Sequence, residues 1–377
     1  MDRRTAPRDH DGMTSTTALP ALATGEFDIG TTYLDTAAYG IPPARAFAAL
    51  REVLDGWAHG HTTPAHYDDR VDRLRASYAR LLTGANAADV AIGASVAALI
   101  GPAAAALAPG AEVLVAAGDF ASVPNPFRYR GDLRVRTVAF DRLAQEVRPE
   151  TALVACSLIQ SADGRAVDRA ALRAATRAHD ALLLFDISQA AGWLPLRFED
   201  ADIWVGASFK WLLGARSVGL LAMRPEIAAR LRPPAPGWYA AADRWAEMYA
   251  PQRLADTVRR FDSTPDWLGV VGALAGADLL EELTIAAIRD HDLALAARFR
   301  AGLPELGLVP VAGAAPIVSI PGAGAAAEHL TTAEVATTAR AGALRLSFHL
   351  YNDSGDVDRA LKVLGDIMNS SGSGGLA

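Results

Sequence analysis

The chain has 377 residues, of which 51% are hydrophobic and 21% charged, and its formal net charge at pH 7 is −7. This length and composition permit one large domain and one smaller domain with packed cores. The negative charge argues against a broad basic surface, so we expect no nucleic-acid partner. The single cysteine, Cys156, excludes an intramolecular disulfide framework and a cysteine-based metal cluster. It suits a reducing, cytoplasmic setting.

The N-terminal residues 1–30 are predicted to form an arm outside the folded domains. The first 25 are polar and rich in Arg and Pro at their start and lack the apolar region of a signal peptide, and Met13 is an alternative to Met1 as the native start. The longest uncharged stretch, 90–111, is long enough to suggest a membrane span. It is Ala-rich and interrupted by Gly and Pro, so we interpret it as a strand end, a turn and a buried helix, and we expect no membrane partner.

Short apolar strands alternate with helical or loop segments through the middle of the chain. The predicted strands are 111–118, 133–140, 151–159, 180–186, 201–208 and 217–224. A helix between the third and fourth strands begins at a predicted N-cap, Asp168. Near-continuous apolar strands separated by helices are typical of a mostly parallel sheet that is covered on both faces. The link from 208 to 217 is too short for a crossover helix, which predicts that the last strand is antiparallel.

The pattern changes after about Arg232. Helices are predicted at 267–283 and 284–303, strands within 315–322 and 343–350, and a final helix from near Asp356. We therefore predict an α/β protein divided into a large domain over 31–265, a connecting helix over 266–283, a small α+β C-terminal domain over 284–369 and a flexible tail over 370–377.

Two charged residues stand at the ends of predicted strands. Asp186 ends one strand, and Lys210 follows the next one along the chain. Ligands gather at the carboxyl ends of parallel strands, and neighbouring strands lie about 5 Å apart, so both groups can face one small ring. A pyridine cofactor uses such a pair: the carboxylate keeps the ring nitrogen protonated, and the lysine forms a Schiff base with the aldehyde.

Each residue alone has an ordinary structural interpretation, as a surface lysine or a strand-end cap. Composition favours the chemical interpretation. The chain has only two lysines, Lys210 and Lys362, among 36 basic residues. An arginine stays protonated and does not form an ordinary imine, so a retained lysine indicates a task that arginine cannot perform. Lys362 falls on the polar face of the last predicted helix.

A resemblance becomes specific at these residues. The stretches "LLLFDISQAAGWLPL" and "ADIWVGASFKWLLGARSVGLLAMRPE" resemble the class V aminotransferase family of pyridoxal-phosphate (PLP) enzymes, which includes cysteine desulfurases, isopenicillin N epimerase-like proteins, kynureninase and C–S lyases. Four further stretches are similar to family landmarks in the same order: "YLDTAAYGIPP", "GDFASV", "RRFDSTP" and "LRLSFHLYNDSGDVD". The resemblance covers most of the chain from Tyr33 onward. It implies PLP fold type I, with a mostly parallel seven-stranded sheet in the large domain.

The resemblance also implies roles for single residues. Lys210 would form the Schiff base and then act as general base and acid at the substrate Cα. Asp186 would pair with the pyridinium nitrogen, Gln189 would hydrogen-bond the ring hydroxyl, and Phe120 would stack on the ring. Many relatives have His at the position of Phe120, so a second acid or base is missing here. Arg345 would bind the substrate carboxylate in two-point fashion.

The cofactor phosphate needs hydroxyls, backbone amides and a helix N-terminus. Ser95 and the amide of Val96 are candidates, because "IGASVAALIG" combines a strand end with a helix start. Ser208 is a second hydroxyl candidate. Thr264 resembles a family residue that reaches the phosphate of the partner subunit, which implies a homodimer with its active sites at the interface. For each hydroxyl alone, a turn or cap is the ordinary alternative.

The remaining polar landmarks are assigned more simply. Tyr39 and the histidines of "HGHTTPAHY" are substrate-side candidates. The histidine stretch lacks a carboxylate or cysteine at ligand spacing before Asp68, so we expect no metal site. His349 and Asn352 are interpreted as structural.

The cofactor does not fix the reaction, because PLP labilises any bond to Cα. Cys156 lies inside an apolar strand and not on a late mobile loop, so a persulfide-forming desulfurase is not expected. An aminotransferase, a C–S β-eliminating lyase and an epimerase stay open, and we favour the aminotransferase on family membership.

Two other classes of protein are alternatives. A nucleotide-binding oxidoreductase would need G-x-G-x-x-G, which "GASVAALIG" lacks, and a non-catalytic PLP-fold protein would have lost Lys210 or Asp186.

Overall fold

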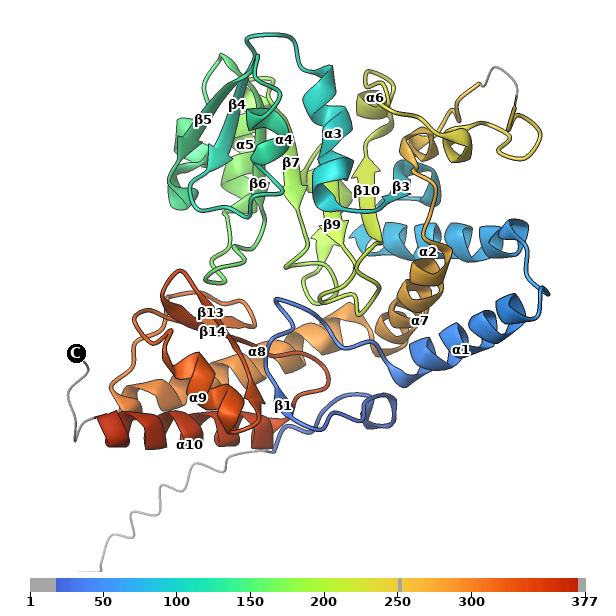
Figure 1. Cartoon of the computed structure of the whole chain (residues 1–377). Helices are drawn as coiled ribbons and strands as arrows, with labels where there is room; N and C mark the ends of the chain where they lie inside the picture. Colours follow the sequence, from blue (N-terminus) through green and yellow to red (C-terminus); the bar gives the residue numbers. More distant parts are fainter. Residues whose placement is uncertain (1–17, 250–252, 372–377) are drawn as a thin grey trace, which may run out of the picture.

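A computed structural model describes residues 18–249 and 253–371 of the chain (Figure 1). The first 17 residues of the predicted arm, with Met13, and residues 372–377 of the predicted tail lie outside the described residues.

A seven-stranded sheet forms the centre of the large domain. Its strands are β3 (Val90–Gly93), β4 (Glu112–Ala116), β5 (Arg134–Val138), β6 (Thr151–Ser157), β7 (Leu182–Asp186), β9 (Ile203–Ala207) and β10 (Gly219–Met223). The order is β3-β10-β9-β7-β6-β4-β5. Strand β10 pairs antiparallel with both of its neighbours, and the other pairs in the sheet are parallel. The mostly parallel sheet and its antiparallel last strand are thereby confirmed.

Helices cover both faces of this sheet, as the continuous apolar strands require. Alternate residues of one strand point to opposite faces. In β4, Val113 and Val115 join the core that contains Leu99 of α3 (Val96–Ala106), while Leu114 faces the core that contains Leu172 of α5 (Arg169–Ala178). Asp168 accepts a hydrogen bond from the backbone N–H of Ala171 at 3.0 Å, so the predicted N-cap of α5 is confirmed.

Three long helices extend the large domain beyond the sheet. Helices α1 (Ala44–Ala58) and α2 (Asp68–Arg80) both pack against α7 (Trp267–Leu283), to the right of the sheet in Figure 1. Helix α7 occupies the predicted connecting segment and leads directly into α8. The smaller elements of the large domain are β2 (Leu82–Thr83), α4 (Asn125–Arg128), β8 (Leu196–Arg197) and α6 (Pro225–Ala228).

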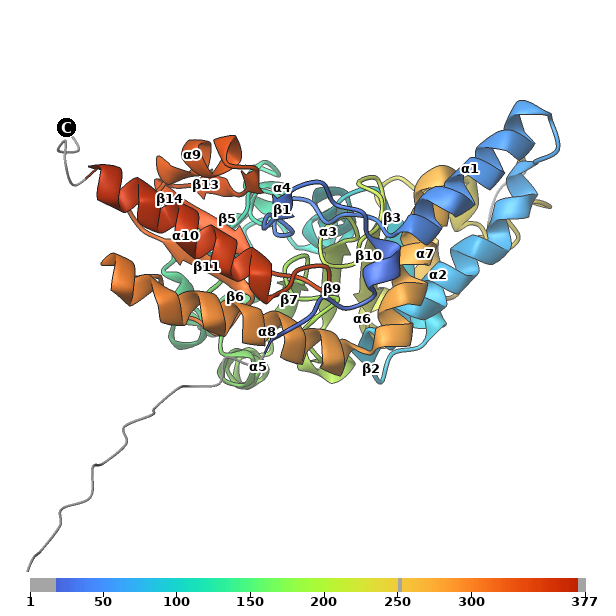
Figure 2. The same cartoon turned by 90° about the horizontal axis from the view of Figure 1, so that it is seen from below.

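The C-terminal part has its own sheet and core. Strands β11 (Ile317–Ile320), β13 (Thr338–Arg340) and β14 (Ala343–Ser347) pair antiparallel in the order β11-β14-β13. The helices α8 (Ile285–Gly302), α9 (Ala326–Thr332) and α10 (Ser354–Ser371) pack around this sheet, and Figure 2 shows α8 and α10 side by side. Helix α10 begins two residues before the predicted Asp356, and it includes the first two residues of the predicted tail.

The described part of the predicted arm packs against the rest of the chain. Strand β1 (Thr32–Tyr33) pairs in parallel with β12 (Val335–Ala336). Upstream of it, the backbone N–H of Leu22 donates to the carbonyl of Leu350 at 2.7 Å, and Phe27 packs against the main core. These apolar side chains bury surface, which explains why residues 18–30 differ from a free arm. Within the described ranges, no helix is long and apolar enough to cross a membrane.

Candidate active site

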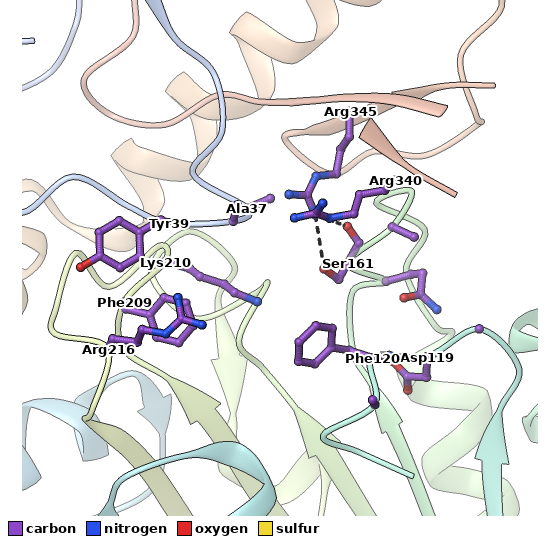
Figure 3. Close-up of a pocket in the computed structure, with 15 residues that line it drawn as sticks. Ala37, Tyr39, Asp119, Phe120, Ser161, Phe209, Lys210, Arg216, Arg340 and Arg345 are labelled. Atoms are coloured by element: carbon purple, nitrogen blue, oxygen red, sulfur yellow. Dashed lines mark hydrogen bonds between the residues drawn. The ribbon is translucent and has the colours of Figure 1, made fainter. Parts of the chain in front are cut away.

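Four neighbouring parallel strands end at the same edge of the large sheet, and each leads to a residue of the candidate site. Strand β4 leads to Phe120, β6 to Ser161, β7 ends in Asp186, and β9 leads to Lys210. The cavity at this edge has a volume of about 540 Å³ and is closed on its other side by residues of the small domain. Figure 3 shows the side chains that line it. The predicted meeting of Asp186 and Lys210 at one edge therefore follows from the topology.

Lys210 is the buried amine of this cavity. Its side chain lines the cavity although the residue is only 7% exposed. Among the described residues, its Nζ makes no hydrogen bond or ion pair, and it lies 5.4 Å from the centroid of the Phe120 ring. Burial lowers the pKa of Lys210 to about 8. The charges of Arg345, Arg340 and Arg216 act in the same direction, and Asp186 opposes them. A neutral, nucleophilic amine is thus accessible near physiological pH.

Asp186 is buried at the end of β7 with one oxygen available. Its Oδ1 accepts from the backbone N–H of Ser188 at 2.8 Å and from the hydroxyl of Ser188 at 2.6 Å. No described residue donates a hydrogen bond to its Oδ2. Burial raises the pKa of Asp186, while the Ser188 hydrogen bonds and the charge of Lys210 oppose this rise. A protonated ring nitrogen placed at Oδ2 would favour the ionised carboxylate further.

Phe120 presents an apolar ring to the cavity. It is 52% exposed, which is unusual for a phenylalanine, and it lies beside Lys210 in Figure 3. Its loop is anchored by Asp119, which accepts hydrogen bonds from the backbone N–H of Phe120 at 2.8 Å and from the backbone N–H and the hydroxyl of Ser157 at 2.8 and 2.6 Å. These groups fit a flat, charged pyridine ring: the Phe120 ring can stack on it, the Asp186 Oδ2 can pair with its protonated nitrogen, and the Lys210 amine can bind its aldehyde.

Gln189 does not line the cavity itself, but it forms hydrogen bonds to two residues that do. Its amide nitrogen donates to the carbonyl of Ala37 at 2.9 Å and to the hydroxyl of Ser161 at 3.1 Å, and its oxygen accepts from the indole N–H of Trp211 at 2.8 Å. Both amide hydrogens are therefore engaged. Gln189 can reach a ring hydroxyl only by exchanging the Ser161 partner, so the assignment of Gln189 to the ring hydroxyl stays a prediction.

The start of α3 lies at the same sheet edge as Lys210. Gly93 of β3 pairs with Gly219 of β10, which pairs with Ala207 of β9. Ser95 is thus two strands, or about 10 Å, from the Lys210 strand. The Ser95 hydroxyl accepts from the N–H of Ala98 at 3.3 Å as the helix N-cap, and the first amides of the helix, including that of Val96, have no partner within it. This arrangement fits a phosphate.

Ser208 differs from its predicted role as a phosphate ligand. Its hydroxyl is completely buried and lies 2.8 Å from the carbonyl of Ala215 and 2.7 Å from that of Val218. Both carbonyls also accept a backbone N–H, that of Val218 from Ser208 at 3.0 Å and that of Ala215 from Val218 at 3.4 Å, so the serine hydroxyl reinforces the tight link between β9 and β10. Ser208 therefore belongs to the framework of the Lys210 loop and does not line the cavity.

Thr264 is exposed and does not line the cavity of its own chain. The next residues, Pro265 and Asp266, line a groove with Trp57 and Trp267. The histidine stretch runs beside this groove, and none of its histidines lines the Lys210 cavity, which differs from their prediction as substrate-side residues. The described residues contain no group of three or more His, Cys, Asp or Glu that could hold a metal ion.

Arg345 lies on the small-domain wall of the cavity, and its predicted role at the substrate carboxylate stays a prediction. It is 1% exposed. It donates to the carbonyl of Ser161 at 2.7 Å and pairs with Asp35 at 3.1 Å, and its buried Nε has no partner in the described part of the chain. Tyr39 also lines the cavity and is 41% exposed.

The loop that carries Lys210 is held from two directions. The N–H of Gly40 donates to the carbonyl of Phe209 at 2.8 Å, and a Cβ at Gly40 would meet the carbonyl oxygen of Lys210 at 1.9 Å, so only glycine allows this approach. From the small domain, Nε2 of the buried His349 contacts the carbonyl of Trp211 at 3.1 Å, while its Nδ1 contacts Asp292 at 2.8 Å. His349 has the structural role predicted for it.

Among the cavity residues that were not predicted from the sequence are Ser161, Arg216 and Arg340. Ser161 follows a predicted strand at the correct edge, which is a usable signal. The Arg216 guanidinium lies 5.1 Å from the centroid of the Phe209 ring, on the Lys210 side of the cavity. Arg340 is one of many arginines in this chain, and only the fold of the C-terminal part brings it here.

Fold and site together define a PLP-type enzyme: a doubly covered, mostly parallel sheet whose strand ends place a lysine and an aromatic ring in one cavity and a buried carboxylate at the end of the neighbouring strand. The aminotransferase class-V family model matches residues 32–333. The chain belongs to this family and is a PLP-dependent enzyme.

The relatives and solved structures agree with this assignment. The chain is 26% identical to the uncharacterized aminotransferase YcbU of Bacillus subtilis over 83% of this chain and 88% of that protein. It is 28% identical to kynureninase of Deinococcus radiodurans over 73% and 72% of the two chains. Among solved structures, the cystine C–S lyase C-DES has a TM-score of 0.81 at 22% identity, covering 89% of this chain and 98% of that chain. The cysteine desulfurase CsdA of Escherichia coli has a TM-score of 0.78 at 18% identity, covering 90% and 95%. These two likenesses show the shared fold.

Proposed function

We propose that the protein is an aminotransferase that acts on an α-amino acid, with Lys210 as the Schiff-base lysine. The observation that carries this proposal is the unpartnered Lys210 amine in the cavity beside the exposed Phe120 ring, with the Asp186 Oδ2 buried and unpartnered at the end of the neighbouring strand β7. Burying a charged group without a partner is costly unless a ligand supplies one.

Each residue has a defined task in this proposal. PLP, when bound, withdraws electrons from the bonds at the substrate Cα. The Asp186 carboxylate holds a proton on the ring nitrogen, and Phe120 stacks on the ring face. The Lys210 amine, once free of the cofactor, takes and returns the proton at Cα, a task for which its lowered pKa suits it. Ser95 and the Val96 amide hold the phosphate at the start of α3.

Arg345 and Tyr39 act on the substrate. The Arg345 guanidinium, fixed by Asp35 and Ser161, orients the α-carboxylate on the small-domain side. Tyr39 lies at the mouth of the cavity and packs near Phe209, with ring centroids 5.8 Å apart. A substrate held this way presents its Cα toward Lys210.

Transamination is favoured over β-elimination and epimerisation by the family and by the name of the YcbU relative. A persulfide mechanism is disfavoured, because Cys156 is fully buried in β6 within the main core and burial raises the pKa of its thiol well above its usual range. Kynureninase and the cystine C–S lyase keep a lyase reaction as the second candidate.

The active form is proposed to be a homodimer in which Thr264 reaches the partner's phosphate site. Its support is an apolar surface next to Thr264: Phe47, Leu54 and Trp57 of α1 are 45%, 45% and 61% exposed, and Trp57 lines the groove beside Pro265. Contiguous exposed apolar residues of this size mark interaction surfaces. Gel filtration tests the dimer, and a monomer that carries PLP would contradict it.

A cytoplasmic location stays a prediction that rests on the cysteine content.

The reaction is tested with purified, PLP-loaded protein and a panel of amino acids. We expect a visible absorption band from the bound cofactor, and keto acid beyond one equivalent per chain only when an amino acceptor is added. Pyruvate and thiol formed without an acceptor would replace transamination by elimination, and loss of substrate chirality alone would indicate an epimerase. Protein that takes up no PLP would overturn the enzyme proposal in favour of a non-catalytic PLP-fold protein.

A further inference from the structure

The hairpin β13–β14 places two guanidinium groups on one wall of the cavity. Thr338 of β13 pairs directly with Arg345 of β14, and Arg340 lies two residues beyond Thr338 on the same strand. Residues that alternate along a strand share a face, so Arg340 and Arg345 lie on the same face of the hairpin. Figure 3 shows the two guanidinium groups near one another, with Arg216 across the cavity.

Arg345 is already held by the protein. Its two terminal nitrogens contact the carbonyl of Ser161 at 2.7 Å and the carboxylate of Asp35 at 3.1 Å. The residue is buried, and Asp35 offsets much of its charge. What Arg345 still offers is the unpartnered Nε, together with the remaining N–H groups of its terminal nitrogens.

Arg340 has no such partner. It forms no ion pair with any residue that the structure describes, and its hydrogen bond is to the carbonyl of the adjacent Ala339 at 3.1 Å. Its charge lowers the pKa of both Arg345 and Lys210, which means that it repels these two cations. The nearby carboxylate, Asp35, is already bonded to Arg345, so two guanidinium groups share one anion on this wall.

The turn between the strands fixes this position. Ala341 and Gly342 have φ angles of 48° and 78°, as in a two-residue hairpin turn, and the strands on either side are paired through Ala343. Arg340 is therefore the last residue of β13 on a short, defined hairpin. Its side chain lines the cavity and is solvent-exposed, so it can reach an incoming ligand.

We propose that Arg340 binds a second anionic group at the end of the substrate side chain, and that the substrate is an acidic α-amino acid. Arg345 takes the α-carboxylate, and Arg340 takes the side-chain carboxylate or an equivalent anion from the same wall. A planar guanidinium suits both, because it offers two parallel N–H donors to a carboxylate. This inference rests on the proposed function, since it assumes an amino acid bound at Lys210.

The test compares acids with their neutral amides of nearly equal shape. PLP-loaded wild-type protein, R340Q and a control variant, R142Q, are titrated with L-glutamate and L-glutamine, and with L-aspartate and L-asparagine. Arg142 is an exposed surface arginine with an (i, i+4) partner far from the cavity lining. The readout is the amino-acid concentration that half-saturates the change in the visible band, which measures binding without requiring turnover, and thermal melting reports on folding.

We expect wild type and R142Q to bind one acid about 10- to 100-fold more tightly than its amide, as loss of a charge-assisted hydrogen bond implies. R340Q should lose this preference while it binds the amide as before, and R340K should restore part of it. Equal binding of acid and amide by wild type would overturn the inference. An equal loss for acid and amide in R340Q would also overturn it, because Arg340 would then act on the α-carboxylate or on the fold. If no visible band forms at all, it is the proposed function that fails.

Discussion

The two walls of the cavity are built on opposite principles. The large-domain wall follows a row of parallel strand ends; the Lys210 amine that lines it and the Asp186 Oδ2 buried at the end of the neighbouring strand have no partner in the described part of the chain. On the small-domain wall, a short hairpin carries Arg345, which is paired with Asp35, and Arg340, which is not. The large-domain side suits a cofactor whose aldehyde reacts with Lys210 and whose protonated nitrogen pairs with Asp186. The small-domain wall suits the anionic groups of the substrate.

Lys210→Ala changes only the large-domain wall, and it is the substitution for which we expect the largest effect. It removes the amine that fixes the cofactor, so we expect complete loss of the visible band and of activity. Lys362→Ala on α10 is the matched control and should keep both. Absorbance scans of the two variants after incubation with PLP check this, and a band that survives in Lys210→Ala would place the Schiff base elsewhere.

The pH dependence of cofactor uptake tests the buried amine itself. Its pKa in the folded apoprotein is lowered to about 8, and only the neutral amine attacks an aldehyde. Below pH 8 the uptake rate should rise roughly tenfold per pH unit, and it should level off above pH 8. Rates measured by stopped flow should differ from those of N-acetyl-lysine, which serves as the unburied control. An uptake rate that keeps rising to pH 10 would contradict the lowered pKa of Lys210.

The same lowered pKa predicts how the stability of the apoprotein depends on pH. Burial disfavours the charged lysine in the folded state, so between pH 8 and 10.5 the unfolded chain binds more protons and stability should rise with pH.

Asp186→Asn keeps the shape of the large-domain wall and removes its charge. The ring nitrogen then loses its charged partner, and kcat should fall about 10- to 100-fold while the band persists at a shifted position. Asp119→Asn is a useful comparison, because Asp119 bonds to the Ser157 hydroxyl and backbone and should affect the Phe120 loop instead. An Asp186→Asn protein with unchanged kcat would remove Asp186 from the cofactor site.

Arg345→Lys weakens the small-domain wall only. A lysine retains the charge beside Asp35 but cannot offer two parallel donors, so KM should rise about tenfold with a smaller change in kcat. Steady-state kinetics at fixed acceptor concentration separate the two constants. If kcat falls and KM stays constant, Arg345 acts on the cofactor side of the cavity.

The smallest expected effect belongs to the subunit contact. Thr264→Ala removes one neutral hydrogen bond to the partner's phosphate site and should weaken PLP binding by about two- to tenfold. Ser263→Ala, at the adjacent exposed serine, is the control. PLP affinity measured by fluorescence titration checks the difference, and an unchanged affinity would leave Thr264 without a role in the partner's site.

The strand-end residues of the large-domain wall were predictable from the residue pattern, Arg345 on the small-domain wall was named only through the family resemblance, and Arg340 was not predicted. Asp186 and Lys210 end or follow apolar strands, and strand order alone brings them to one edge. Arg340 is far in the chain from Lys210 and reaches the same cavity only when the C-terminal domain packs over the sheet. Ser208 shows the reverse case: a hydroxyl two residues from Lys210 is turned inward, where it bonds to the carbonyls of Ala215 and Val218. Sequence patterns predict the ends of strands well. They do not show which side-chain hydroxyls of a tight loop bond to the backbone of that loop.

The central claim is that Lys210 carries the cofactor, and the chain allows a direct test because it has only two lysines. PLP-loaded protein is reduced with borohydride, digested, and mapped by mass spectrometry. We expect one pyridoxyl group per chain, on Lys210, with Lys362 unmodified. Label on Lys362, or no stable label on any lysine, would contradict it.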